Sequence, residues 1–306
     1  MQDVPVEQRR SLDAPVVEAQ AMTAPRVRFL LRWVLMPLAV AAFLLVLSFR
    51  ARRMHEDKLR EGCKHRLTEF SFAVLGYRDT HLGLYPPGTA SGSGLSPDQR
   101  LSWITLLYNF FDESQNVNFL FDRSLPWDSS VNRVPTIRSL RDEASGNPSY
   151  SDWVPPRLFP YQVLVCPANV KGTDSGVTNF VGISGVGSDS PTLPTGHPRA
   201  GVFGFDRQTS VADIKDGVAC TMMLAETADG IGPWIAGGPA TVRGLDPGRR
   251  PYIGPGRPFG GSHPGGAMIA FADGSVRFLR ESIDPTVFEA LSTAAGGEVV
   301  PTGWGQ

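Results

Sequence analysis

The side chains of this sequence whose types could do chemistry are three cysteines and one histidine that precedes an Asp-Gly pair. Cys63, Cys166 and Cys220 lie far apart and form no C-x-x-C spacing, so the cysteine pattern does not predict a zinc site. His263 stands ten residues before Asp273. This pair would supply only two ligands, whereas zinc typically takes about three or four from the protein. We therefore expect structural roles, with His263 capping a loop and Asp273 shaping a turn with Gly274.

Two interpretations of the cysteines stay open. One disulfide with one thiol left over suits an oxidising compartment, whereas three reduced, buried thiols are the alternative. Cys63 and Cys166 form the candidate disulfide, because Cys63 lies on the inward face of a predicted helix and Cys166 ends a predicted core strand. A bond between them would close a loop of about 100 residues, which the chain-entropy model values at roughly 4–5 kcal/mol.

Other catalytic and ligand-binding patterns are missing from the sequence. There is no G-x-S-x-G nucleophile elbow, and residues 182–185, GISG, have the wrong spacing for one. No G-x-x-x-x-G-K phosphate loop occurs. Oxygen ligands for calcium occur in 188–190, 213–217 and 229–230, but not in an EF-hand pattern. We predict no catalytic, cofactor-binding or metal-binding residues, and a protein that is not an enzyme.

The element that must position everything else is an apolar run near the N-terminus. Residues 33–49, WVLMPLAVAAFLLVLSF, contain no charge, and arginines flank them on both sides. With its flanks this segment predicts a transmembrane helix over residues 26–50, because about 20 apolar residues cross a bilayer core of about 30 Å. A cleaved signal peptide is the competing interpretation, but its apolar core usually has only about 7–15 residues. Residues 1–25 lack hydrophobic periodicity and are predicted to be a disordered tail.

A second helical signal continues directly past the anchor. An apolar stripe recurs every three or four residues, at Leu59, Cys63, Leu67, Phe70, Val74 and Tyr77. Charged side chains occupy the other faces, which is typical of an amphipathic helix with one buried stripe. We therefore predict one long helix, whose first half lies in the membrane and whose second half, over 51–80, is a spine packed against a domain.

The rest of the chain favours short strands and turns. It is rich in turn-forming residues, with 33 glycines and 26 prolines among 306 residues. We predict a core helix over 101–111 and strands over 161–166, 178–183, 201–205 and 221–226. Packed loops are expected over 112–156, and a surface loop or irregular strands over 229–261.

The C-terminal part carries the clearest local pattern. Residues 267–272 and 275–279 are two β-type runs on either side of Asp273-Gly274. This pattern predicts a hairpin with a two-residue turn, because both turn residues tolerate positive φ. Asp284 then caps a short predicted helix with Pro285 in its first turn, which Gly296-Gly297 ends.

These segments, in this order, resemble a known family. The matching stretches are 63–88 (CKHRLTEFSFAVLGYRDTHLGLYPPG), 100–107 (RLSWITLL), 164–167 (LVCP), 178–182 (TNFVG), 201–205 (GVFGF), 211–217 (VADIKDG) and 262–279 (SHPGGAMIAFADGSVRFL). His263, nine residues and then Asp273-Gly274 are similar to the H-x9-DG signature of domain-of-unknown-function family 1559. That family is also catalogued as prepilin-type-processing-associated and as solute-binding protein family 10. The resemblance covers about residues 50–300.

The resemblance implies an α+β, pilin-like fold, in which a long N-terminal helix carries a β-rich, loop-rich domain. The expected parts are the tail 1–25, the transmembrane helix 26–50, the family domain 51–300 with its β-rich part over 100–300, and a C-terminal tail 301–306. The resemblance also implies a bacterial envelope protein with its domain outside the cytoplasmic (inner) membrane. Many members carry a Gly-Phe-Thr-Leu-Ile-Glu processing site, but the corresponding region here reads RVRFLLRWVLMPLAV. We therefore expect no cleavage by a prepilin peptidase, and filament assembly would lack the glutamate that pilins use.

Membrane orientation is a point of conflict. Three arginines precede the apolar run and seven Lys or Arg residues follow it within residues 50–66. By the positive-inside rule this count alone places the domain in the cytoplasm. We favour the outside, because the family resemblance implies it. The basic residues after the anchor lie among acids on the amphipathic spine and can serve the surface of the domain.

Two classes of function follow. The leading one is a non-enzymatic, single-pass structural or interaction protein of the envelope. It would bind membrane lipid through residues 26–50 and contact envelope or secretion-system-like protein partners. A net charge of −1 gives no case for nucleic-acid binding. The alternative is a membrane-tethered solute- or ligand-binding domain, with an aromatic-lined pocket from Trp103, Trp127, Trp153 and Trp234. The sequence names no small-molecule ligand.

Overall fold

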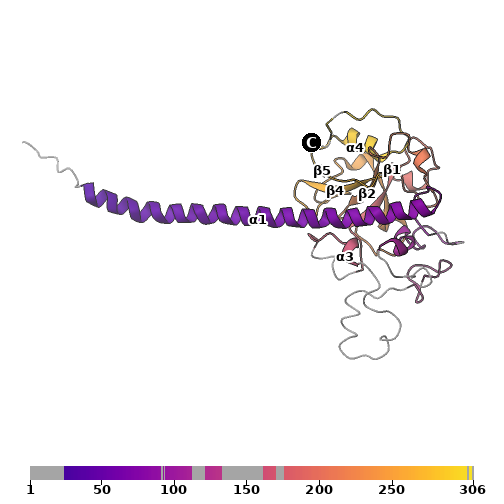
Figure 1. The fold of residues 1–306 in the computed structure, drawn as a ribbon, viewed down its shortest axis with the longest axis horizontal. Coiled ribbons are helices and arrows are strands. Elements are labelled where there is room, and N and C mark those ends of the chain that lie inside the picture. The colour runs from indigo at the N-terminus through magenta and orange to yellow at the C-terminus, as the bar shows by residue number, and fades with distance from the viewer. Residues whose placement is uncertain are drawn as a thin grey trace, which may run out of the picture. The chain divides into compact units, whose positions relative to one another are not determined.

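The computed structural model describes residues 24–90, 92, 94–111, 121–132, 161–169, 176–301 and 303–304. The chain divides into two units, Met1–Met54 and His55–Gln306. Helix α1 (Ala24–Thr80, 57 residues) begins in the first unit and ends in the second (Figure 1). Most of the predicted tail 1–25, and Trp153, lie outside the described residues.

The first unit contributes the apolar half of α1. Its side chains are exposed, with Trp33 69%, Phe43 62% and Leu45 69% accessible. Among the residues that the structure describes, this helix is long and apolar enough to cross a membrane, with a mean hydropathy of 1.7 in its most apolar window. Pro37 lies inside the helix without ending it. The helix is consistent with single-pass membrane anchoring.

The second half of α1 buries the predicted stripe. Cys63, Leu67, Phe70 and Val74 are fully buried, whereas Phe72, on another face of the same helix, is 62% exposed. The stripe belongs to the same hydrophobic core as side chains of the sheet. The spine is therefore part of the core of the second unit.

Five strands form one mixed sheet in the order β3-β1-β2-β4-β5. They are β1 (Phe180–Val186), β2 (Met222–Glu226), β3 (Val242–Leu245), β4 (Gly266–Phe271) and β5 (Val276–Arg280). Strand β1 pairs with β3 in parallel, and the other neighbouring strands pair antiparallel. The fold is α+β, with a long N-terminal helix followed by a sheet domain, as predicted.

The sheet separates two cores, because side chains alternate between its faces along each strand. In β4, Met268 and Ala270 belong to the core that α1 shares, while Ile269 and Phe271 belong to the core on the other face. Helix α4 (Pro285–Ser292) covers that second face and contacts β1 and β2. Figure 1 shows the spine part of α1 and helix α4 on opposite sides of the sheet.

Two short apolar runs have a different structure from the one predicted. Residues 161–166 form the short helix α3 (Tyr161–Leu164) and a turn, not a strand. Residues 101–111 contain two 3₁₀ helices, η1 (Trp103–Leu106) and η2 (Tyr108–Phe110), instead of one core helix. Apolar runs of this length are buried in either conformation, so their pattern does not select one.

Of two glycine-rich predictions, the one for residues 201–205 needs correction. Residues 201–205 form no strand. Arg207 takes the carbonyls of Gly201 and Phe203, which a strand ladder would otherwise use. Residues 229–261, predicted as a surface loop or irregular strands, contain the short edge strand β3, whose pairing with β1 has a register shift.

The C-terminal hairpin is confirmed, but its turn is longer than predicted. The Phe271 N–H donates to the Ser275 carbonyl at 2.9 Å, which leaves a three-residue loop over 272–274. Within this loop only Gly274 has positive φ, at 88°. Asp273 Oδ1 accepts from the Ser275 N–H at 2.9 Å, so Asp273 does shape the turn.

Helix α4 begins as the sequence predicts. The Asp284 side chain accepts a hydrogen bond from the Thr286 N–H at 2.8 Å, and Pro285 occupies the first turn. The helix ends at Ser292, before Gly296.

An aromatic cluster joins the spine to the sheet. Phe70 of α1 stacks on Trp103 with ring centroids 5.1 Å apart, and it meets Phe180 of β1 edge-on at 6.0 Å. The Trp103 ring also contacts Phe203 at 4.6 Å and donates its Nε1–H to the Thr241 carbonyl at 3.0 Å. Phe70 is therefore at the centre of the contact between helix and sheet.

A buried cation organises the loops around β1. Arg207 is 6% exposed, and its guanidinium donates to the carbonyls of Ser184, Ser190, Leu193, Gly201 and Phe203. Burial lowers its pKa to about 10. A positive charge held by carbonyl dipoles fixes the loop geometry, because the guanidinium supplies a donor to buried carbonyls such as those of Gly201 and Phe203.

We predict that Phe70→Ala lowers the free energy of unfolding by about 3–5 kcal/mol, because it leaves a cavity between α1 and Trp103. Phe72→Ala, on the exposed face of the same helix, should change it by less than about 0.5 kcal/mol. Urea unfolding of the detergent-solubilised chain, followed by tryptophan fluorescence, measures both. Equal losses for the two variants would contradict the packing described here.

Arg207→Met should cost about 3 kcal/mol of stability, because several buried carbonyls lose their donor at once. The control is Arg249→Met, which removes a half-exposed cation 3.6 Å from Asp229 and should cost less than about 1 kcal/mol. The same urea titration compares them. An unchanged free energy of unfolding in Arg207→Met would mean that the loops do not depend on this guanidinium.

Candidate functional site

Four chemically active side chains from distant segments meet between the spine and the sheet. They are Cys63 on α1, Cys166 in the turn after α3, Glu226 at the end of β2 and His263 before β4. One ligand atom of each lies within 4.8 Å of the ligand atoms of the others. His263 is 3% exposed and the other three are fully buried. We call these four residues the Cys-Glu-His cluster.

The spine brings Cys63 into the cluster. Cys63 belongs to the buried stripe of α1, and the preceding residue, Gly62, has no side chain. A Cβ at position 62 would lie 3.2 Å from Cγ of Pro167. The glycine therefore lets the turn that carries Cys166 approach the helix closely.

Hydrogen bonds fix the Cys166 turn. The Cys166 N–H donates to Asn179 Oδ1 at 3.1 Å, and the Asn179 amide donates to the Thr227 carbonyl at 2.9 Å. The Arg66 guanidinium of α1 donates to the Val165 carbonyl at 2.5 Å. Asn179 thus ties the turn to the residue that follows Glu226, and Arg66 ties the turn to the spine.

Strand alternation turns Glu226 toward the spine. Ala225 belongs to the core on the α4 side, so the next side chain faces the α1 side. Glu226 Oε2 accepts the Met268 N–H at 3.0 Å. The other oxygen, Oε1, is buried and has no hydrogen-bond partner.

His263 lies at the centre of the cluster. Its Nε2 is 3.3 Å from Cys166 Sγ and 3.7 Å from Glu226 Oε1. Its Nδ1 faces Glu56 Oε2 of α1 at 3.8 Å. Neither Nδ1 nor this Glu56 oxygen has a hydrogen-bond partner.

The cluster perturbs the acidity of its members. The pKa of Cys166 lies well below its ordinary value, because the Cys63 thiol donates to it and His263 adds positive charge, against the effect of burial. The pKa of the Cys63 thiol is raised, first by its hydrogen bond to Cys166 and then by burial. Burial also raises the pKa of Glu226, to about 7. Burial opposes protonation of His263. The hydrogen bond between His263 and Cys166 and the negative charge of Glu226 outweigh the effect of burial, so the pKa of His263 is raised.

Two kinds of chemistry suit this arrangement. Two thiols, an imidazole and a carboxylate are ligands for a borderline-soft metal cation. Two adjacent thiols can also form a disulfide. A cysteine beside a histidine is the pairing of nucleophilic enzymes, but here both side chains are buried, which leaves a substrate no access.

The predicted site residues have separate positions. Cys63 and Cys166 do come together, as free thiols, and their disulfide stays a prediction. Cys220 packs beside the core on the α4 side. His263 and Asp273 lie beyond opposite ends of β4, so the two residues of the signature do not form one site.

Glu226 is the member that the sequence analysis missed. Its only signal is a carboxylate directly after four apolar residues in a buried strand. A fully buried acid needs a partner, so its position in the strand pattern is informative once the strand is known.

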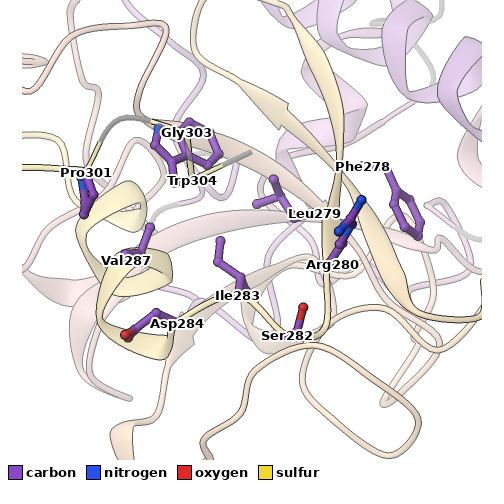
Figure 2. A pocket seen from close by; sticks show the side chains of 10 residues that line it. All are labelled: Phe278, Leu279, Arg280, Ser282, Ile283, Asp284, Val287, Pro301, Gly303 and Trp304. Atoms are coloured by element: carbon purple, nitrogen blue, oxygen red, sulfur yellow. The ribbon is translucent and has the colours of Figure 1, made fainter. Parts of the chain in front are cut away.

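The described tryptophans of the predicted aromatic pocket belong to the core or pack against it, and the pocket itself stays a prediction. Trp103 and Trp234 are buried in the core, and Trp127 packs against that core. A hollow of about 280 Å³ instead lies between β5, α4 and the C-terminal segment that carries Trp304 (Figure 2). It is smaller than a typical ligand pocket of about 300–1,000 Å³. A second hollow, of about 370 Å³, lies between α1 and β5 and is within that range.

The acids considered for calcium are engaged elsewhere. Arg199 forms a bidentate ion pair with Asp189, in which each guanidinium nitrogen lies 2.7 Å from a carboxylate oxygen. This pair lowers the pKa of Asp189 to about 2. Asp213 accepts from the Ser210 N–H at 2.8 Å. These carboxylates serve the local structure.

Comparison with known proteins supplies the family. The sequence model of SBP_bac_10, described as a protein of unknown function (DUF1559), matches residues 51–244 and 235–286. No curated protein and no solved structure gives a match. The matched region includes the spine, the sheet and all four residues of the Cys-Glu-His cluster. Since the match covers well over half of the sequence, the chain belongs to the DUF1559 family.

Proposed function

We propose that this protein is a single-pass envelope protein whose α1 anchors a pilin-like domain outside the cytoplasmic membrane. The domain acts as a structural or interaction module for other envelope proteins. The observation that carries this proposal is the continuity of α1 from Ala24 to Thr80. One helix is exposed and apolar in its first half and forms part of the core of the domain in its second.

Contacts of the basic residues on the spine support the orientation. The Arg60 guanidinium donates to the Pro264 carbonyl and lies over the Phe278 ring at 4.4 Å. Arg66 donates to the Val165 carbonyl. Since these arginines bind the domain itself, their presence after the anchor has a structural cause, and the positive-inside count loses weight.

A non-enzymatic role is part of the proposal. The described Cys-His pair is buried. The hollow in Figure 2 is lined by Phe278, Leu279, Arg280, Ser282, Ile283, Asp284, Val287, Pro301, Gly303 and Trp304. Asp284, its one carboxylate, caps α4. This lining offers no nucleophile paired with a base.

Protease treatment of intact spheroplasts tests the location of the domain. With a tag after Gln306, we expect the tag to be lost without lysis, because the domain lies outside the membrane. A cytoplasmic protein in the same cells should stay intact as the control. Protection of the tag until lysis would place the domain in the cytoplasm, and the envelope role would have to be withdrawn.

The mass of the protein isolated from membranes tests processing. We expect no cleavage near residue 30, because the region RVRFLLRWVLMPLAV has no Gly-Phe junction. A pilin carrying Gly-Phe-Thr-Leu-Ile-Glu in the same cells is the positive control. A mature chain that starts near residue 30 would show that a peptidase recognises this region after all.

A further inference from the structure

The Cys-Glu-His cluster has the ligand types of a structural metal site. Thiolate, imidazole and carboxylate are the side chains that bind Zn²⁺, and structural zinc sites use four of them in a tetrahedron. Here each ligand comes from a different segment, which is why no short motif announces the set. A common metal ion would join α1, the α3 turn, β2 and the segment before β4.

Distances within the cluster fit a tetrahedral ion. Zinc–ligand bonds of about 2.0–2.3 Å separate neighbouring ligand atoms by roughly 3.3–3.8 Å. The Cys166 Sγ to His263 Nε2 distance is 3.3 Å, and the His263 Nε2 to Glu226 Oε1 distance is 3.7 Å. The most distant pair lies within 4.8 Å, so closure needs a movement of about 1 Å.

One atom in the cluster, Glu226 Oε1, is a buried acceptor that a bound cation would neutralise. Glu226 is fully buried and its Oε2 already accepts a backbone N–H, which fixes the orientation of the carboxylate. Its Oε1 has no hydrogen-bond partner and lies 3.7 Å from His263 Nε2. A buried carboxylate oxygen without a partner is costly, and a bound cation removes that cost.

The surroundings also resemble those of a metal-bound histidine. Metal-ligating histidines usually present their second ring nitrogen to a carboxylate or carbonyl. His263 Nδ1 faces Glu56 Oε2 at 3.8 Å, and both atoms otherwise lack partners. With Nδ1 protonated and held by Glu56, Nε2 is free to bind a metal.

We propose that Cys63, Cys166, Glu226 and His263 bind one Zn²⁺ ion, which fastens the spine helix to the sheet domain. Binding requires both sulfurs as thiolates, so any proton still on a ligand atom is released to solvent, and the ligand set is Cys₂-His-Glu. A Cys63–Cys166 disulfide would compete, because it consumes both sulfur ligands. The disulfide, however, leaves Glu226 Oε1 without a hydrogen-bond partner, whereas the metal would coordinate all four groups.

Metal analysis tests the proposal directly. The full chain, purified in mild detergent without chelator and with reductant, should contain about one zinc ion by mass spectrometry of the elements. Cys220→Ser is the matched control and should retain the ion, because Cys220 is outside the cluster. Cys166→Ser and His263→Gln should reduce bound zinc at least about tenfold. Retention of zinc by both variants would overturn the assignment.

Cobalt substitution provides a readout that does not depend on variants. After zinc removal, Co²⁺ added to the wild-type chain should give visible bands of a tetrahedral site and an intense near-ultraviolet sulfur-to-cobalt band. Glu226→Gln keeps the volume of the side chain and the acceptor for Met268, and should weaken Co²⁺ binding at least about tenfold. Absence of zinc and of the sulfur-to-cobalt band in folded, reduced wild-type protein would overturn the proposal.

Thiol counting separates the metal from the disulfide. Alkylation of freshly isolated protein in denaturant and chelator, without reductant, should modify all three cysteines. Modification of only one would identify a disulfide and overturn the metal site. Chelation should also lower the melting temperature of the wild type by roughly 5–10 °C, and leave that of Cys166→Ser unchanged. If chelation left the melting temperature of the wild-type protein unchanged, this result would contradict the proposal of a structural zinc ion.

Discussion

The burial of one stripe of α1 against the sheet is the contact on which the rest of this structure depends. Short helices such as α3 and η1 also contribute side chains to that core, but α1 is the long helix in it, and its Leu67, Phe70 and Val74 are fully buried there. A helix that is also apolar and exposed before residue 55 cannot exchange this face for another without losing that core. The exposed apolar half and the packed half are both parts of helix α1 (Ala24–Thr80).

The same packing decides where chemistry can occur. Alternation along β2 sends Ala225 to the α4 side and Glu226 to the α1 side, directly toward the stripe that carries Cys63. The Cys166 turn is held in reach by Asn179 and by the absence of a side chain at Gly62. The cluster is therefore a product of the three-layer architecture, and moving β2 by one residue would turn the carboxylate to the other core.

Sequence patterns predicted the elements whose signals are local. The stripe of α1, the hairpin around Gly274 and the Asp284 cap each depend on residues close in sequence. Short apolar runs such as 161–166 were ambiguous, because burial alone does not distinguish a turn of helix from a strand. The Cys-Glu-His cluster could not be predicted, since members that are consecutive in the sequence are 37 to 103 residues apart. In addition, no partner for Glu226 could be named until the sheet order was known.

The position of the cluster along the spine explains why a firm joint belongs there. Glu56, Arg60 and Cys63 occupy the first turns of α1 that contact the domain, and Arg60 binds the carbonyl of Pro264 beside His263. Nearer its C-terminal end, α1 is already held by the stacking of Phe70 on Trp103. The loop that follows α1 is held by the hydrogen bond that the Tyr85 hydroxyl donates to the Ala272 carbonyl. Ends of packed elements open most easily, so the end next to the anchor is where an additional bond has the greatest effect. The proposed zinc ion would fasten α1 to three other segments at that end, through one buried ligand from each of the four.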